Sequence, residues 1–263
     1  MPVNGIQVCV ETFGEPTEPP LLLLAGEASS MDWWDDELCR RLAAGGRFVI
    51  RYDHRDTGRS TCFPIGVPGY SGVDLMNDAL GVLDVLGVPA AHLVGFSLGG
   101  GLGMRIAVRH PGRVLSLTLM ATSACTGGTT IGADVRTGID WSNRKAAVAG
   151  LIAEVIAHGG PFTPDEPQLR RLAERVFDRS TSLAAARDNH RLAGYGPPVR
   201  DRLGDIAVPT VVLHGTLDER FPAEHAEELA RAIPGARLVW LEGVGHEFPP
   251  RAVWDRVIDE VLA

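Results

Sequence analysis

The feature that most constrains this chain is the pentapeptide Gly95-Phe96-Ser97-Leu98-Gly99. It follows an apolar run, residues 91–94, that fits a buried strand, and the residues after it carry apolar side chains at helical spacing. A serine at such a strand-to-helix turn is held in a strained conformation, and the positions flanking the turn lack room for a side chain. The pattern therefore predicts a nucleophile elbow with Ser97 at its tip.

Length and composition are those of an ordinary globular α/β protein. The 263 residues are 45% hydrophobic and 22% charged, which is enough to bury a sizeable core. The net charge of −8 argues against a nucleic-acid partner, because such proteins normally carry a basic patch. The N-terminus lacks the segments of a secretory signal, and no apolar run approaches the ~18 residues of a membrane span. We expect a cytoplasmic protein without a membrane partner, and leave homodimer formation open.

No metal or cofactor site is predicted. The motif HExxH is absent, and no acidic cluster has the spacing of a calcium loop. The cysteines are widely separated and have no zinc-ligand spacing, so we expect free thiols at Cys9, Cys39, Cys62 and Cys125.

Strand and helix patterns alternate along most of the chain. Apolar runs typical of buried strands occupy residues 21–25, 48–52, 91–94, 114–120, 210–214 and 237–241. Helical spacing occurs at residues 34–44, 73–86, 98 to beyond 105, 223–233 and 252–262. This alternation predicts an α/β fold with a mostly parallel central sheet covered by helices on both faces.

The segment 124–201 has a different pattern. It contains three helical patterns, at 146–156, 167–177 and 183–192, separated by glycine- and proline-rich turns and without a convincing strand. We interpret it as a helical cap inserted into a core made of residues 1–123 and 202–263. Ligands in open α/β sheets bind beyond the carboxyl ends of the strands, so a cap at that edge would cover the site.

Two loops offer partners for Ser97. A serine hydroxyl is a poor nucleophile at neutral pH and needs a base to take its proton and an acid to orient that base. Asp218 follows the strand predicted at 210–213, and His246 follows the strand predicted at 237–241. The order Ser97, Asp218, His246 is the order of α/β-hydrolase triads. We therefore predict these three as the catalytic residues, with Asp205 or Asp140 as alternatives for the acid.

Other side chains have weaker claims to a role. His54, in the charged cluster 53–60, could line a pocket, although such residues more often hold a loop together. The remaining histidines that we expect to face solvent or the cap are His92, His110, His158, His190 and His225. The aromatic residues that could form either a substrate pocket or core are Trp33, Trp34, Trp141, Phe162, Phe177 and Tyr195.

Taken together, these motifs resemble the α/β-hydrolases along nearly the whole chain. The residues that carry the resemblance are Leu21–Gly26, Asp53–Ser60, Gly95–Gly99, His214–Asp218 and Gly243–His246. The stretch Asp53–Ser60, with the preceding Arg51-Tyr52, is most similar to the anthracycline (aclacinomycin) methylesterases. That resemblance implies hydrolysis of a carboxylic ester on a bulky substrate. We expect a small-molecule ester that is hydrophobic and of small to medium or bulky size, and, since the metal motifs are absent, chemistry without a cofactor.

In this fold the oxyanion is held by two backbone N–H groups. One belongs to the residue after the nucleophile, here Leu98, and the other to the loop after the strand at 21–25, here Glu27. The family usually has His-Gly just before that second donor, whereas this chain has Ala25-Gly26. Anthracycline methylesterases also depart from the histidine there.

Several functions share this framework. The expected mechanism is ester hydrolysis through an acyl-enzyme. The same triad also serves C–C bond hydrolases, lactonases, thioesterases and cofactor-free haloperoxidases or perhydrolases. Epoxide and haloalkane hydrolases place an aspartate at the elbow, so Ser97 argues against them. A non-catalytic ligand receptor is the alternative from a different functional class.

Overall fold

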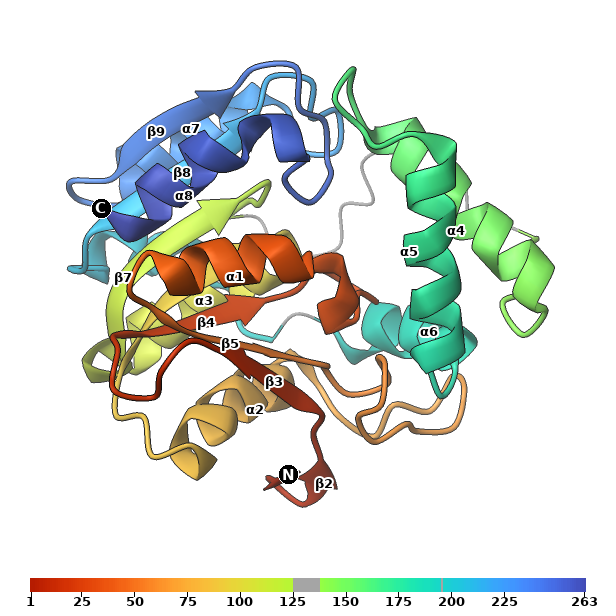
Figure 1. Ribbon diagram of the computed structural model, residues 1–263. Coiled ribbons are helices and arrows are strands. Elements are labelled where there is room, and N and C mark those ends of the chain that lie inside the picture. The colour runs from red at the N-terminus through yellow and green to blue at the C-terminus, as the bar shows by residue number, and fades with distance from the viewer. Residues whose placement is uncertain (125–137, 195) are drawn as a thin grey trace.

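A seven-stranded sheet forms the centre of the protein (Figure 1). The computed structural model describes residues 1–124, 138–194 and 196–263, so Cys125 and Tyr195 lie outside the described residues. The strand order is β3-β5-β4-β6-β7-β8-β9, and every neighbouring pair is parallel except β3 with β5. The strands are β3 Val10–Phe13, β4 Pro20–Leu24, β5 Phe48–Tyr52, β6 Ala91–Phe96, β7 Val114–Met120, β8 Thr210–Gly215 and β9 Arg237–Leu241. Two short strands, β1 Pro2–Val3 and β2 Ile6–Gln7, form a separate antiparallel pair.

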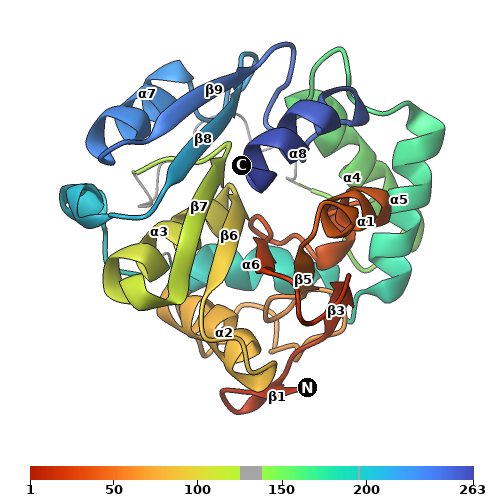
Figure 2. The ribbon, with the colours of Figure 1, turned by 60° about the vertical axis from the view of Figure 1, so that its left-hand side comes forward.

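Helices cover both faces of the sheet, which confirms the predicted fold class (Figure 2). One face packs against α1 Asp36–Ala44 and α8 Trp254–Leu262. The other packs against α2 Gly72–Val85, α3 Leu98–Arg109 and α7 Ala223–Ala232. Short 3₁₀ helices occur at Met31–Trp33, Pro111–Arg113, Arg200–Asp205 and Arg251–Val253. Among the described residues, no helix has the length and apolar character needed to cross a bilayer.

Three further helices lie between β7 and β8, and we call them the cap helices (Figure 1). They are α4 Arg144–His158, α5 Glu166–Arg179 and α6 Leu183–Ala193. Each begins where a side chain accepts a hydrogen bond from the first turn, at Asn143, Asp165 and Ser182. Between 124 and 201 the described residues contain helices and no strand. The division of the chain at these two positions stays a prediction.

Apolar packing joins the cap helices, mainly α4 and α5, with Leu183 at the start of α6 in the same cluster. Buried side chains of α4, including Ala147 and Leu151, meet Leu169 and Val176 of α5 in a cluster separate from the two faces of the sheet. Trp33, from the loop after β4, packs against the same cluster. The cap helices therefore have a small apolar core of their own, and their attachment to the sheet depends largely on other contacts.

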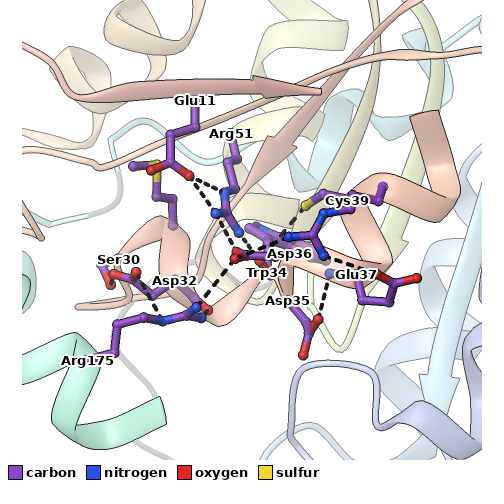
Figure 3. A network of polar contacts seen from close by, with 12 residues as sticks. Glu11, Ser30, Asp32, Trp34, Asp35, Asp36, Glu37, Cys39, Arg51 and Arg175 are labelled. Carbon is purple, nitrogen blue, oxygen red and sulfur yellow. Dashed lines mark hydrogen bonds and ion pairs between the residues drawn. The ribbon is translucent and has the colours of Figure 1, made fainter. Parts of the chain in front are cut away.

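Arginines of α5 provide one such attachment. Arg179 contacts both carboxylate oxygens of Asp53 at 2.6 Å and donates to Asp32 at 2.7 Å. Arg175 lies within 3.5 Å of Asp32 and 3.6 Å of Asp36, which also pairs with the buried Arg51 (Figure 3). Three carboxylates beside the sheet, Asp32, Asp36 and Asp53, thus hold α5 of the cap by ion pairs.

The cluster Asp53–Ser60 is the core side of this attachment. Gly58 adopts φ of +48°, and a Cβ there would lie 2.2 Å from the Asp53 carboxylate, so only glycine fits. Arg55 forms a two-point ion pair with Asp78 of α2. Asp56 accepts hydrogen bonds from Tyr70 and from Asn189 of α6. These ion pairs and hydrogen bonds hold the loop Asp53–Ser60 together, which is the structural role that the sequence analysis favoured for it.

Removing Arg179 should destabilise the protein strongly. Asp53 is fully buried, so Arg179→Met leaves an uncompensated carboxylate inside the protein. We expect a loss of about 3–5 kcal/mol in the free energy of unfolding, measured by urea denaturation. Adding Asp53→Asn should recover part of that loss. The matched control is Arg144→Met, which breaks an exposed pair with Asp178 and should change stability little. Equal effects of the two arginine variants would contradict this interpretation.

Candidate active site

The elbow places Ser97 between the end of β6 and the start of α3. Ser97 has φ of +52° and ψ of −113°, a conformation that L-residues rarely adopt. Its N–H donates to Met120 O at 2.9 Å, and Thr122 Oγ1 donates to its carbonyl at 2.8 Å. Neighbouring β7 therefore holds the strained turn in place and leaves the side chain at the carboxyl edge of the sheet.

The two glycines of the elbow are sterically required. A Cβ at Gly95 would lie 2.4 Å from the carbonyl carbon of Gly99, inside the same turn. A Cβ at Gly99 would lie 2.2 Å from the carbonyl oxygen of Leu24 in β4. Both distances are far below van der Waals contact. The first turn of α3 thus lies directly against the sheet, as the sequence pattern predicts.

Ser97, His246 and Asp218 form one hydrogen-bonded chain. His246 Nε2 lies 3.2 Å from Ser97 Oγ, and its Nδ1 lies 2.9 Å from Asp218 Oδ2. A carboxylate only accepts hydrogen bonds, so it favours the tautomer with the proton on Nδ1 and an acceptor at Nε2. The imidazole packs against the rings of Phe96 and Phe221. The structure thus brings together the three side chains that the sequence singled out.

Asp218 is held in a buried turn after β8. Its Oδ1 accepts from the N–H groups of Arg220 and Phe221, both at 2.9 Å. Burial by itself raises the pKa of Asp218, but the hydrogen bond and charge of His246 and the Phe221 N–H outweigh it, so the pKa lies below its usual value. The carboxylate is therefore ionised at neutral pH and can orient the imidazole. His214, whose Nε2 bonds Phe221 O at 2.7 Å, closes the same turn.

The alternative acids lie elsewhere. Asp205 is an exposed residue that pairs with Arg202, and Asp140 is an exposed residue that accepts from Ser142. Neither is hydrogen-bonded to His246, whose Nδ1 faces Asp218. Geometry therefore favours Asp218 over both.

Glu27 and Leu98, the residues whose N–H groups are predicted to hold the oxyanion, line the same cavity as Ser97 and His246. Leu98 is the first residue of α3, so its N–H has no acceptor within the helix. Glu27 lies in a turn after β4 that is closed by the Ser29 N–H on Gly26 O at 3.2 Å. Both residues therefore lie beside the nucleophile, on two different strand ends.

The cavity has a volume of about 740 Å³ and lies between the core and the cap helices. Six of its lining residues are aromatic, namely Trp33, Phe96, Phe162, Phe221, Phe248 and Trp254, and six are arginines, namely Arg171, Arg175, Arg187, Arg191, Arg220 and Arg251. Of the aromatic candidates from the sequence, Trp33 and Phe162 line it. Trp34 lies in the core beneath α1 and α8, Phe177 packs in the cap cluster, and Trp141 lies under the guanidinium of Arg187.

The histidine loop is attached to the cap, which the sequence did not predict. The His246 N–H donates to His158 O at the end of α4, at 2.7 Å. Glu247, which is buried, accepts from Gly160 N–H at 3.0 Å and from Thr163 Oγ1 at 2.9 Å. Burial raises the pKa of this carboxyl. No sequence signal distinguishes Glu247 from an ordinary loop acid.

The expectation for His190 was wrong, because it faces neither solvent nor the interior of the cap. Only 3% of it is exposed, and it lies between α6 and the loops after β4 and β5. His54 is also buried and does not line the cavity; its Nε2 lies 3.3 Å from Ala25 O. A helical pattern places a residue on a face but does not say what packs on that face.

Comparisons with known proteins support the family and the fold. Residues 19–249 match the family model of the alpha/beta hydrolase fold. Rhodomycin D methylesterases of Streptomyces sp. strain C5 and of Streptomyces peucetius are each 35% identical over 268 residues, covering 91% of this chain and 88% of theirs. The enol-lactonase of Burkholderia xenovorans LB400 has a TM-score of 0.79 at 27% identity, covering 99% of this chain and 96% of that one. These matches confirm the expected resemblance, and the chain belongs to the α/β-hydrolase family.

Proposed function

We propose that this protein hydrolyses a carboxylic ester through an acyl-enzyme formed on Ser97. As a member of this family with methylesterase relatives, the protein is a carboxylic ester hydrolase. The observation that supports the mechanism is the hydrogen-bonded chain from Ser97 through His246 to Asp218. Nucleophile, base and orienting acid are all within reach of one another beside a cavity.

In the first step Ser97 Oγ attacks the ester carbonyl carbon while His246 Nε2 takes the hydroxyl proton. Asp218 stabilises the imidazolium that forms. The Leu98 and Glu27 N–H groups hold the negative charge that develops on the carbonyl oxygen, and each such donor contributes about 2.7–4 kcal/mol to transition-state stabilisation. The imidazolium then protonates the departing alcohol, which leaves the acyl group on Ser97.

In the second step water replaces the alcohol. His246 takes a proton from the water as it attacks the acyl-enzyme, and the same two N–H groups hold the second oxyanion. The imidazolium then returns the proton to Ser97 Oγ, and the carboxylic acid leaves.

We propose a methyl ester of a bulky, polycyclic acid as the substrate. Two relatives are named as methylesterases of rhodomycin D. A cavity of about 740 Å³ with aromatic residues in its lining is in the range that holds a drug-sized ligand. Trp33 on the core side and Phe162 beside the cap offer flat apolar surfaces to such rings.

Replacing the nucleophile should abolish both turnover and covalent labelling. Wild-type protein treated with a fluorophosphonate should gain one adduct, located on Ser97 by peptide mass spectrometry. Ser97→Ala should show neither the adduct nor ester hydrolysis above background, because the substitution removes the hydroxyl that is hydrogen-bonded to His246 Nε2. Ser142→Ala, at an exposed turn, is the control and should behave as wild type. An adduct that persists in Ser97→Ala would exclude Ser97 as nucleophile.

Replacing the acid by its amide should be nearly as damaging. In Asp218→Asn the amide oxygen can still accept from the Arg220 and Phe221 N–H groups, so the turn can keep its shape. Its NH₂ then faces His246 Nδ1 and favours the wrong tautomer, for which we expect kcat to fall about 10⁴-fold. Asp205→Asn, at the surface, should leave kcat unchanged. A large loss in Asp205→Asn together with an active Asp218→Asn would reverse the assignment.

A substrate panel should separate ester hydrolysis from its rivals on the same triad. We expect methyl esters of polycyclic aromatic acids to show higher kcat/KM than methyl butyrate, because remote contacts with the cavity contribute to transition-state binding. The same assays should include an enol-lactone, a vinylogous 1,5-diketone, a thioester and a peroxide. A preference for the lactone or the diketone would exclude the methylesterase assignment. A stoichiometric burst without turnover on any of them would favour a receptor.

A further inference from the structure

The turn that carries Glu27 is held by a side chain from the cap. His190 of α6 receives the Ala28 N–H at Nδ1, at a distance of 3.0 Å. Its other nitrogen, Nε2, lies 2.8 Å from the carbonyl oxygen of Arg55. A backbone N–H only donates and a carbonyl only accepts, so the ring is neutral, with its proton on Nε2. Burial lowers the pKa of His190, which keeps it in this form.

Ala28 needs such a restraint. Its φ is +55°, in the left-handed region that a non-glycine residue adopts at an energetic cost. The peptide between Glu27 and Ala28 is hydrogen-bonded at both of its polar groups. The Glu27 carbonyl accepts from Ser29 Oγ at 3.2 Å, and the Ala28 N–H donates to His190 Nδ1. This peptide shares the Glu27 Cα with the preceding peptide, whose N–H is the proposed oxyanion donor. Because the turn is hydrogen-bonded on both sides of Glu27, these two peptides cannot reorient independently about that Cα.

The other end of the turn is also fixed. The Ala25 carbonyl lies 3.3 Å from His54 Nε2, and the Gly26 carbonyl accepts from the Ser29 N–H. The rings of His54 and His190 lie 6.1 Å apart, edge to face. Two buried imidazoles, one from the core and one from the cap, thus bracket the Glu27 N–H. This chain lacks the His-Gly pair that the family usually has before this donor, and carries Ala25-Gly26 instead.

We propose that His190 is a positioning residue of the oxyanion hole, through which the cap helix α6 sets the orientation of the Glu27 N–H. This inference rests on the proposed function, since it takes Ser97 as nucleophile and Glu27 as oxyanion donor. His190 does not touch the substrate; it acts through the Ala28 peptide. Catalysis then requires α6 to be docked on the core.

Two substitutions separate this role from simple packing. In His190→Asn the amide oxygen lies where Nδ1 was and can accept from the Ala28 N–H, but the side chain is too short to reach Arg55. In His190→Gln the amide NH₂ can reach the Arg55 carbonyl, but no acceptor remains at the Nδ1 position. Each variant keeps one of the two buried hydrogen bonds, so similar thermal midpoints are expected for the two.

Activity should differ between them. With p-nitrophenyl butyrate as probe, His190→Gln should lower kcat about 10–100-fold with little change in KM, less than the 10²–10³-fold cost of deleting a donor outright. His190→Asn should retain most of the wild-type kcat. The affinity for a trifluoromethyl ketone, which forms a tetrahedral adduct with a reactive serine, should fall in parallel with kcat/KM. The affinity for butyrate should not. His92→Gln, a partly buried histidine on β6 bonded to Ser116, is the control and should keep full kcat.

A further variant removes the donor without touching His190. Incorporating lactic acid at position 28 by nonsense suppression replaces the Ala28 N–H by an ester oxygen and should reproduce the kcat loss of His190→Gln. This measurement also decides the matter if neither histidine variant folds. Equal loss of kcat in the Asn and Gln variants, or a full kcat in the lactic acid protein, would overturn the proposal. Failure of the wild type to be labelled at Ser97 would instead overturn the proposed function on which it rests.

Discussion

The close approach of α3 to the sheet is the constraint on which the rest of the site depends. A Cβ at either Gly95 or Gly99 would fall within 2.4 Å of backbone atoms, so the approach exists only because both positions lack side chains. It forces Ser97 to φ of +52° and directs its side chain away from the packed turn. The strain is offset by hydrogen bonds that join Ser97 to Met120, the last residue of β7, and to Thr122 just after it. The reactive hydroxyl is thus placed by backbone sterics, and only then paired with His246.

The sheet and the elbow could be predicted because residues close together in the sequence determine them. Strands β5, β7 and β9 have the predicted bounds, since buried parallel strands are continuous apolar runs with polar turns at each end. The sequence analysis did not identify β1, β2 and β3, which are two to four residues long and each include exposed residues, so they lack a continuous apolar run. Asp218 and His246 could be found because the carboxyl ends of parallel strands meet at one edge. The order of Ser97, Asp218 and His246 in the chain then indicated which is nucleophile, acid and base.

The contacts between core and cap could not be predicted, because they join residues far apart in the chain. Arg179 meets Asp53 and Asp32 across more than a hundred residues, and nothing near Arg179 distinguishes it from an exposed arginine of an amphipathic helix. His190 was missed for the same reason. Glu247 follows His246 directly, but its partners, Gly160 and Thr163, come from the turn after α4. Such long-range polar pairs have no periodicity from which to infer them.

Two hydrogen bonds from the cap reach the loops of the proposed catalytic groups, one at the base and one at the oxyanion donor. The carbonyl of His158 holds the backbone of the proposed base, and the ring of His190 holds the turn of the proposed oxyanion donor. A cap that swung away as a rigid lid would break both of these hydrogen bonds and remove the restraint that each places on its loop. Substrate exchange by movement of α4 and α6 together would therefore be costly. Movement of side chains at the mouth of the cavity, such as the half-exposed Phe162, leaves both contacts intact and is the less costly route.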